Sequence, residues 1–427
     1  MPESLPMIAH GRAVPTLHNA TLPDGRVVDV HLDGGRVRDV VSAAGLPAVG
    51  DELDLAGHLL LTAPAEPHAH LDKALSFDEI RPPMGNLDAA IAAWENYTPT
   101  LTVEGIAERA RRAAMLLLGN GTTAVRTHVN LLRGDDPLRG IRALVAVREE
   151  LADLVDIQIV AMAPYFASDE AIHAALDLGA EFVGGHPHQT PDPSGNLRRL
   201  LAIAQARKVG VDMHTDEQLN PMMLTLEELA HLVRHWPESM PVTAGHCVSL
   251  GVVERDVLDR VIGAVKASGI GIVSLPITNL YLQGWADPVA TPRGLTALRA
   301  LLDAGVRVAG GADNVRDPYN PLGRSDALET AMLMVTAGHL SVGEAYRAVS
   351  DGARDVMGLP VAGVRRGASA ELMAIRASSL EEAVAAAPHD RVVLRRGRLV
   401  SVSRTSRSVA VPTRSERPEP AAVPMSS

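Results

Sequence analysis

The sequence predicts an α/β protein whose main body is a (β/α)₈ barrel, with a small β domain built from both ends of the chain. From Ala63 to about Gly358, short apolar runs alternate with longer amphipathic segments, a pattern typical of parallel strands joined by helices. Eight strand candidates fall in this stretch, the number that closes a barrel. An open doubly wound sheet is the alternative, but no GxGxxG follows any strand, which counts against its dinucleotide-binding form.

The elements follow in order along the chain. Residues 1–62 contain short alternating or β-branched segments separated by the turn signals PDG and DGG, so we expect strands there. Residues 63–364 form the predicted barrel, and residues 365–403 return to short-strand character and complete the β domain. Residues 404–427, rich in Pro, Ser and Arg, are expected to be a mobile tail. The strand candidates are 59–70, 122–129, 156–163, 181–185, 211–214, 242–246, 269–275 and 307–312, and the clearest helix patterns are 103–121, 137–155 and 197–210.

Composition narrows the class of protein. The 427 residues carry a net charge of −11 without a clustered basic face, which argues against nucleic acid or an anionic membrane as the main partner. A single cysteine, Cys247, excludes an internal disulfide and a CxxC-type zinc site. The start of the chain lacks a secretory signal, and no run approaches the roughly 20 apolar residues of a membrane span. We therefore expect a soluble cytoplasmic protein.

Polar groups stand at the ends of several predicted strands. His68 and His70 close the first barrel strand, and residues two apart on a strand point to the same side, so both can reach one ion. His214, His246 and Asp313 each follow an apolar run of their own, and the carboxyl ends of barrel strands carry the active site in this fold. Unrelated structural histidines would rarely show this placement. His68, His70, His214 and Asp313 together form a ligand set suited to Zn²⁺ or Fe²⁺, with one position open for water.

Two further residues near this predicted metal site are candidates for proton transfer. Glu217 lies three residues beyond His214, where it can act as general acid/base. Its structural alternative is a carboxylate at a helix N-terminus. Two roles are open for His246, a fifth ligand or a base that orients the water, and the second fits better because four ligands already leave one open position.

The motifs HAHLDKA, VRTHVN, HTDE, GHC and DNVRDPYNPLG occur in this order along the chain. In this respect the chain resembles the amidohydrolase superfamily, and specifically its cytosine deaminase-like branch. The resemblance implies a distorted TIM barrel with a small β-sandwich from both chain ends, a homo-oligomer, and one divalent metal per subunit held by His68, His70, His214 and Asp313. It also implies that Glu217 moves a proton to the substrate ring, that His246 holds the water and that Asp313 relays a proton to the leaving amine. The binuclear relatives need a lysine after the fourth strand, and residues 183–188 contain none, so one ion is expected.

The chain departs from cytosine deaminases at three positions of the predicted pocket. Pro164 replaces a glutamine that reads the pyrimidine amide edge, and proline has no side-chain donor or acceptor. Asn314 replaces a second aspartate, and Tyr319 stands for a tryptophan. The pattern around Asp313, together with Lys73, looks more like the N-alkyl-ammelide amidohydrolases of triazine breakdown, which lack a glutamate matching Glu217. Cytosine itself is therefore a doubtful substrate.

Further substrate contacts are expected from strand-end residues. His128 ends the second strand and faces the lumen if His68 does, and Tyr165 follows Pro164. His186 lies near the end of the fourth strand, and Gln283, which is matched in deaminases, is expected at the pocket or at a subunit contact.

The predicted function is hydrolysis of a C–N bond in a small nitrogen heterocycle such as an aminopyrimidine or aminotriazine, with release of ammonia or an amine. The alternative is hydrolysis of a cyclic amide, lactam or carbamate in the same mononuclear site. A catalytically silent protein of the same fold would show a lost ligand or a lost Glu217, and the sequence retains all of them.

Overall fold

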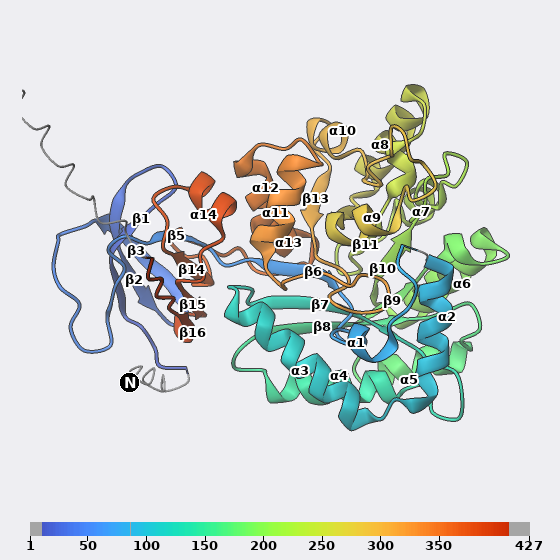
Figure 1. Ribbon diagram of the computed structural model, residues 1–427, viewed down its shortest axis with the longest axis horizontal. Coiled ribbons are helices and arrows are strands. Elements are labelled where there is room, and N and C mark those ends of the chain that lie inside the picture. Colours follow the sequence, from blue (N-terminus) through green and yellow to red (C-terminus); the bar gives the residue numbers. More distant parts are fainter. Residues whose placement is uncertain (1–10, 86, 410–427) are drawn as a thin grey trace, which may run out of the picture.

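A computed structural model describes residues 11–85 and 87–409. Figure 1 shows two bodies, a β-sheet domain that combines blue and red strands from the two chain ends and a larger α/β body. Of the predicted mobile tail, the part beyond residue 409 lies outside the described residues. In the described part of the chain, no helix has the length and apolar character that crossing a membrane requires.

The larger body is built on a sheet of eight parallel strands that neighbour one another in chain order. The two ends of this sheet meet, because Ala69 forms a parallel bridge with Asp313 and the amide of Asp313 donates to the carbonyl of His68 at 3.0 Å. The sheet is therefore a (β/α)₈ barrel, as predicted. Its strands are β6 (Ala65–Ala69), β7 (Ala124–Asn130), β8 (Asp156–Met162), β9 (Phe182–Gly185), β10 (Gly210–Thr215), β11 (Val242–His246), β12 (Gly271–Ser274) and β13 (Arg307–Gly310).

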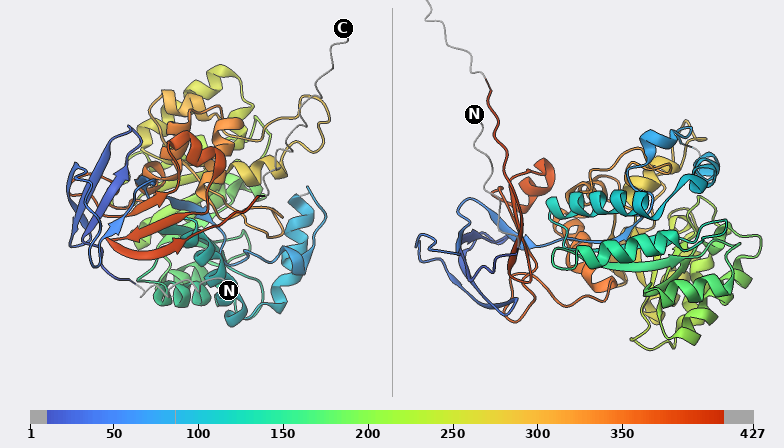
Figure 2. Two further views of the ribbon diagram at one scale, coloured as in Figure 1. Left: turned by 60° about the vertical axis from the view of Figure 1, so that its left-hand side comes forward. Right: turned by 90° about the horizontal axis from the view of Figure 1, so that it is seen from below.

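Helices cover the outside of the barrel (Figure 2). Helix α3 shows why: Thr102 caps its first turn by accepting from the amide of Gly105, and its apolar residues recur at helical spacing and are buried. The helices between the barrel strands are α1 (Phe77–Ile80), α2 (Leu87–Tyr97), α3 (Val103–Gly119), α4 (Arg139–Glu150), α5 (Asp169–Asp177), α6 (Pro193–Arg207), α7 (Thr225–Val233), α8 (Arg255–Ser268), α9 (Pro276–Leu282) and α10 (Leu298–Asp303). Three more follow the last strand, α11 (Ala327–Thr336), α12 (Val342–Val349) and α13 (Asp351–Val356).

The second sheet joins both ends of the chain, as the sequence predicts. Its strands form one continuous, mainly antiparallel sheet in the order β16-β15-β14-β5-β1-β2-β3, with β4 paired to β1. They enclose a separate apolar core that includes Leu17, Val30, Leu372 and Leu394. The strands are β1 (Thr16–Thr21), β2 (Val27–Asp33), β3 (Arg36–Ser42), β4 (Leu53–Asp54), β5 (Leu59–Thr62), β14 (Leu372–Ile375), β15 (Arg391–Arg395) and β16 (Arg398–Ser403), and helix α14 (Leu380–Ala386) connects β14 to β15.

The run 59–70, predicted as a single strand, is divided in two. Leu59–Thr62 pairs with β14 in the second sheet, whereas Ala65–Ala69 belongs to the barrel. Pro64 lies at the break, where its missing N–H interrupts the ladder. The exact domain boundaries proposed from the sequence, after residues 62, 364 and 403, stay a prediction.

Candidate metal and active site

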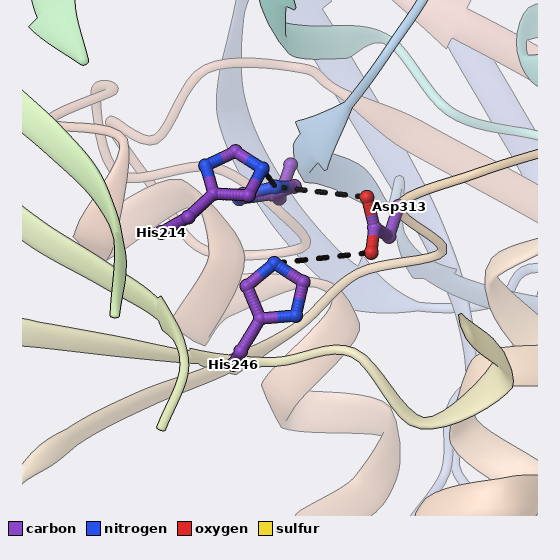
Figure 3. A group of neighbouring side chains, drawn as sticks. His214, His246 and Asp313 are labelled. Carbon is purple, nitrogen blue, oxygen red and sulfur yellow. Dashed lines mark hydrogen bonds and ion pairs between the residues drawn. The ribbon is translucent and has the colours of Figure 1, made fainter. Parts of the chain in front are cut away.

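Five polar side chains from four strands meet at the carboxyl end of the barrel. His68 lies in β6 and His70 directly after it, His214 lies in β10, His246 ends β11, and Asp313 follows β13 by three residues. Each is at most 5% exposed. Figure 3 shows His214, His246 and Asp313 pointing toward one another from their separate strands. The structure thus brings together all the residues that the sequence predicts as ligands.

The spacing of the donor atoms fits a metal ion. The Nε2 of His214 lies 3.2 Å from that of His68 and 3.1 Å from that of His70. The Oδ1 of Asp313 lies 3.1 Å from the Nε2 of His70 and 3.7 Å from that of His68. Ligands bound tetrahedrally at about 2.0–2.2 Å from Zn²⁺ lie roughly 3.3–3.6 Å apart, so these four separations are close to those that one ion requires.

His246 belongs to the same cluster. Its ring, together with His68, His214 and Asp313, offers ligand atoms that all lie within 4.8 Å of one another. Its Nε2 is 4.0 Å from the Oδ2 of Asp313 and has no hydrogen-bond partner. Both carboxylate oxygens of Asp313 also lack a hydrogen-bond partner. A buried polar atom without a partner destabilises the folded protein. A cation at this point would satisfy the carboxylate.

Burial sets the charge state of the cluster. It lowers the pKa of His68, His70, His214 and His246 well below 6.5, so these imidazoles are neutral and keep a lone pair for a metal. Burial, followed by the charges of Glu217 and Asp317, raises the pKa of Asp313. A bound divalent cation reverses this last effect, because it favours the ionised carboxylate.

The local sequence explains how the rings come so close. Gly245 precedes His246, and a Cβ at this position would lie 2.9 Å from the His68 ring, so only glycine leaves room for that imidazole. Glu66, two residues before His68, accepts from the amide of His68 at 3.1 Å and from the amide of Ala312 at 3.0 Å. It thereby joins the first and last strands of the barrel beside Asp313. Sequence analysis missed Glu66, although an acidic residue inside an apolar strand was a signal.

Glu217 lies just past β10 and beside His246. Its Oε1 is 3.4 Å from the Nδ1 of His246, and burial raises the pKa of Glu217 to about 8. The preceding Asp216 has a left-handed backbone (φ 51°), and its carboxylate accepts from the amides of Thr225 and Leu226 at the start of α7. Asp216 thus caps the N-terminus of α7. The Glu217 side chain is not used there and lines the cavity instead.

A cavity of about 470 Å³ opens over the cluster, a size suited to a small-molecule ligand. Among the residues predicted for metal, catalysis or substrate, those in its lining are His70, Pro164, Tyr165, His186, His214, Glu217, His246, Asp313, Asn314 and Tyr319. The lining also includes residues that sequence analysis did not assign to the pocket, among them Trp94 of α2, Asn130, Arg133 and Phe166. Asn130 and Phe166 lie within two residues of the predicted His128 and Tyr165, which was a signal, whereas nothing near Trp94 or Arg133 in the sequence indicated the pocket.

Four of the predicted substrate residues have distinct settings in the cavity. His186 is half-buried, its buried Nδ1 has no hydrogen-bond partner, and burial followed by the charge of Lys73 lowers its pKa to about 4. Asn314 donates to the Oδ2 of Asp317 at 2.7 Å. Tyr165 is 55% exposed at the mouth of the cavity. Pro164 presents only an apolar surface to the cavity.

Two other predicted substrate residues lie outside the cavity lining. The His128 ring stacks on that of His68 with 4.0 Å between centroids, and its Nε2 is 3.4 Å from the Oδ1 of Asp212. Burial acts to raise the pKa of Asp212, but His128 and Arg126 outweigh it and lower that pKa. His128 therefore packs against the His68 ring and does not line the cavity. Gln283 donates to the main-chain carbonyl of Glu217 at 3.1 Å.

Lys73 is buried against the same cluster. Its Nζ lies 3.0 Å from the Nδ1 of His70 and 3.1 Å from the Oδ1 of Asp72, and it donates to the Oδ1 of Asn130 at 2.9 Å. It also lies 5.4 Å from the centre of the Trp94 ring. Lys73 thus stabilises one wall of the cavity, and its hydrogen bonds go to other side chains of the protein.

Comparison with known proteins agrees with this geometry. Residues 83–403 match a model of the amidohydrolase family. A pterin deaminase from Rhizobium rhizogenes is 32% identical over 414 residues, covering 91% of this chain and 94% of the relative. An N-isopropylammelide isopropyl amidohydrolase from a Pseudomonas species is 26% identical, covering 90% and 96%. The crystal structure of 5-methylcytosine deaminase from Klebsiella pneumoniae superimposes with a TM-score of 0.84 at 28% identity, covering 93% of this chain and 99% of that one.

The family match spans well over half of the chain, and the relatives match it along nearly their whole length. The neutral imidazoles and the carboxylate at the carboxyl end of the barrel supply the ligand chemistry of a divalent metal site. The chain therefore belongs to the amidohydrolase family and is a metal-dependent hydrolase.

Proposed function

We propose that the protein hydrolyses an exocyclic C–N bond of a small amino-substituted nitrogen heterocycle and releases ammonia or an amine. The observation that carries this proposal is the buried Glu217 carboxyl at the wall of the cavity, beside His246 and the histidine–aspartate cluster. Hydrolysis of this bond needs a nucleophilic water and a group that moves a proton to a ring nitrogen. The named relatives, a pterin deaminase and a 5-methylcytosine deaminase, support the same chemistry.

The proposed ligands of one divalent metal per subunit, Zn²⁺ or Fe²⁺, are His68, His70, His214 and Asp313. Such an ion supplies a Lewis acid that lowers the pKa of water, so that a nucleophile exists at neutral pH. Residues 183–188, at the end of β9, contain no lysine, which supports a single ion. His246, whose Nε2 faces Asp313 without a hydrogen-bond partner, is proposed to hold the attacking water rather than to complete the ligand set.

The proton steps are assigned to the chain's own carboxyl groups. Glu217 takes a proton from the water and passes it to the ring nitrogen beside the carbon under attack. A pKa raised to about 8 by burial suits a group that must both gain and lose this proton near neutrality. Asp313 then takes the second proton of the water from the hydroxyl now bonded to the carbon, and it delivers this proton to the departing nitrogen. The C–N bond breaks, the carbon keeps the oxygen of the water, and ammonia or an amine leaves.

We propose an amino-oxo heterocycle of pterin type as the first substrate to test, with aminopyrimidines and aminotriazines next. The cavity of about 470 Å³ has room for two fused rings, and Trp94 and Phe166 in its lining offer aromatic surfaces. Pro164 cannot hydrogen-bond through its side chain, so recognition of a cytosine edge at this wall is not expected.

The test is release of ammonia or amine by zinc-loaded protein across pterins, aminopyrimidines, aminotriazines and cyclic ureas, with Glu217→Gln as the control. Release that vanishes in the control supports hydrolytic deamination and identifies the ring. Ring-opened acids without ammonia would support the alternative, hydrolysis of a cyclic amide, lactam or carbamate. Turnover of none of these compounds by protein with its metal bound would contradict the proposal.

We further propose that the protein is a cytoplasmic homo-oligomer that binds neither nucleic acid nor membranes. The family resemblance supports the oligomer, and the net charge of −11 argues against a polyanionic partner. Light scattering on the purified protein at several concentrations tests the oligomer, and a monomeric mass throughout would contradict it.

A further inference from the structure

We propose that helix α9 sets the distance between the His246 ring and the Glu217 carboxylate, so that Asn279 and Gln283 are positioning residues for the C–N hydrolysis proposed above, on which this inference rests. Neither side chain lines the cavity. Both lie on one short element, Asn279 within α9 and Gln283 at its C-terminal end. Each makes a hydrogen bond to a different group of the active site.

Asn279 acts on the His246 ring. Its Nδ2 lies 3.0 Å from the Nδ1 of His246, and Asn279 is only 1% exposed. His246 has a left-handed backbone (φ 67°) and is followed by Cys247, which also does (φ 52°), so the strand ends there in an unusual turn. A hydrogen bond at Nδ1 fixes the rotation of the ring, and it thereby directs the opposite nitrogen, Nε2, toward Asp313.

Gln283 acts on Glu217 through the main chain. Its Nε2 donates to the carbonyl of Glu217 at 3.1 Å, and its own amide donates to the carbonyl of Asn279 at 3.0 Å. The loop that follows packs closely on it: a Cβ at Gly294 would lie 2.6 Å from the Cβ of Gln283. The Gln283 side chain is therefore held from both sides, and it anchors the backbone from which the Glu217 carboxylate reaches the cavity.

Thr278 of the same helix reaches the third catalytic loop. Its hydroxyl accepts from the amide of Asn314 at 3.2 Å and donates to the carbonyl of Ala312 at 3.4 Å, on the two sides of Asp313. One helix thus connects the loops that follow β10, β11 and β13. Since misplacement of a reacting group by about 1 Å can cost on the order of 100-fold in rate, a single rigid element that fixes all three loops has a direct effect on turnover.

The test uses full-length, zinc-loaded protein and near-isosteric variants, Asn279→Leu and Gln283→Met. Asn120→Leu is the matched control, because Asn120 also donates its side-chain amide, to the carbonyl of Arg324 at 3.1 Å, but stands before β7, away from the active site. We expect kcat to fall by about tenfold or more in each α9 variant, with KM changed by less than about threefold and metal content unchanged. The double variant should be about as slow as the slower single one, because both changes release one geometry.

Wild-type kcat in folded α9 variants, or an equal loss in Asn120→Leu, would overturn the inference. A second measurement separates it from the proposed function: the ¹⁵N resonances of the His246 ring in zinc-loaded protein, assigned with His246→Gln. These resonances should shift in Asn279→Leu and stay unchanged in Asn120→Leu, whether or not a substrate has been found. Unchanged resonances in Asn279→Leu would refute the role of α9 even if deamination is established.

Discussion

Replacing Gly245 by alanine should disrupt the proposed metal site although it substitutes none of the proposed ligands. The added Cβ would lie 2.9 Å from both Cε1 and Nδ1 of His68, whereas comfortable contact between such atoms begins at about 3.5 Å. The His68 ring would have to move by about 0.6 Å, and metal–ligand distances hold within about 0.2 Å. We expect zinc affinity to fall on the order of 10–100-fold, the usual effect of disturbing a group that orients a ligand. A competition titration against a chromophoric chelator measures it.

Gly263→Ala is the control for this experiment. Gly263 lies in helix α8, and a Cβ there would meet nothing within 4 Å. This change should leave zinc affinity as in wild type and stabilise the protein by about 0.5–1 kcal/mol, because alanine is the better helix former. Wild-type zinc affinity in Gly245→Ala would refute the assignment of His68 as a ligand held in place by its neighbours.

Three further predictions concern catalysis, stability and specificity. Glu217→Gln should keep the fold and the bound metal but lower turnover by about 100-fold or more; nearly unchanged turnover in a steady-state assay would assign the proton transfer to another group. Arg126→Met leaves the buried Asp212 without the guanidinium that contacts it at 2.9 Å, so urea unfolding should show a loss of about 3–5 kcal/mol; a loss below about 1 kcal/mol would contradict this. Pro164→Gln should raise kcat/KM on cytosine, and no gain in a folded variant would mean that other residues of the pocket exclude that ring.

Much of the fold and the cluster could be predicted because both follow from local patterns. The eight barrel strands of the structure fall within or overlap the apolar runs of the sequence, and the polar residues that close them meet because parallel strands end at one face of the barrel. This rule alone was enough to predict the cluster of His68, His70, His214, His246 and Asp313.

Contacts that do not follow from the meeting of strand ends could not be predicted. Nothing in the sequence around Trp94 shows that it lines the cavity beside His186. The contact between the His128 ring and Asp212 arises because strands β7 and β10 both face the interior of the barrel. The partners of Asn279 and Gln283 depend on the path of the loops around α9, and loop geometry is the least encoded in periodicity.

The source of the oxygen and the fate of the nitrogen test the central claim most directly. Zinc-loaded protein would convert the amino heterocycle found in the ammonia assay in water enriched with ¹⁸O, and mass spectrometry would follow the product. We predict that the product gains one oxygen atom from the solvent at the carbon that lost its nitrogen, with one ammonia or amine released per turnover. A product that keeps every nitrogen and gains a whole water molecule, as a ring-opened acid does, would contradict deamination.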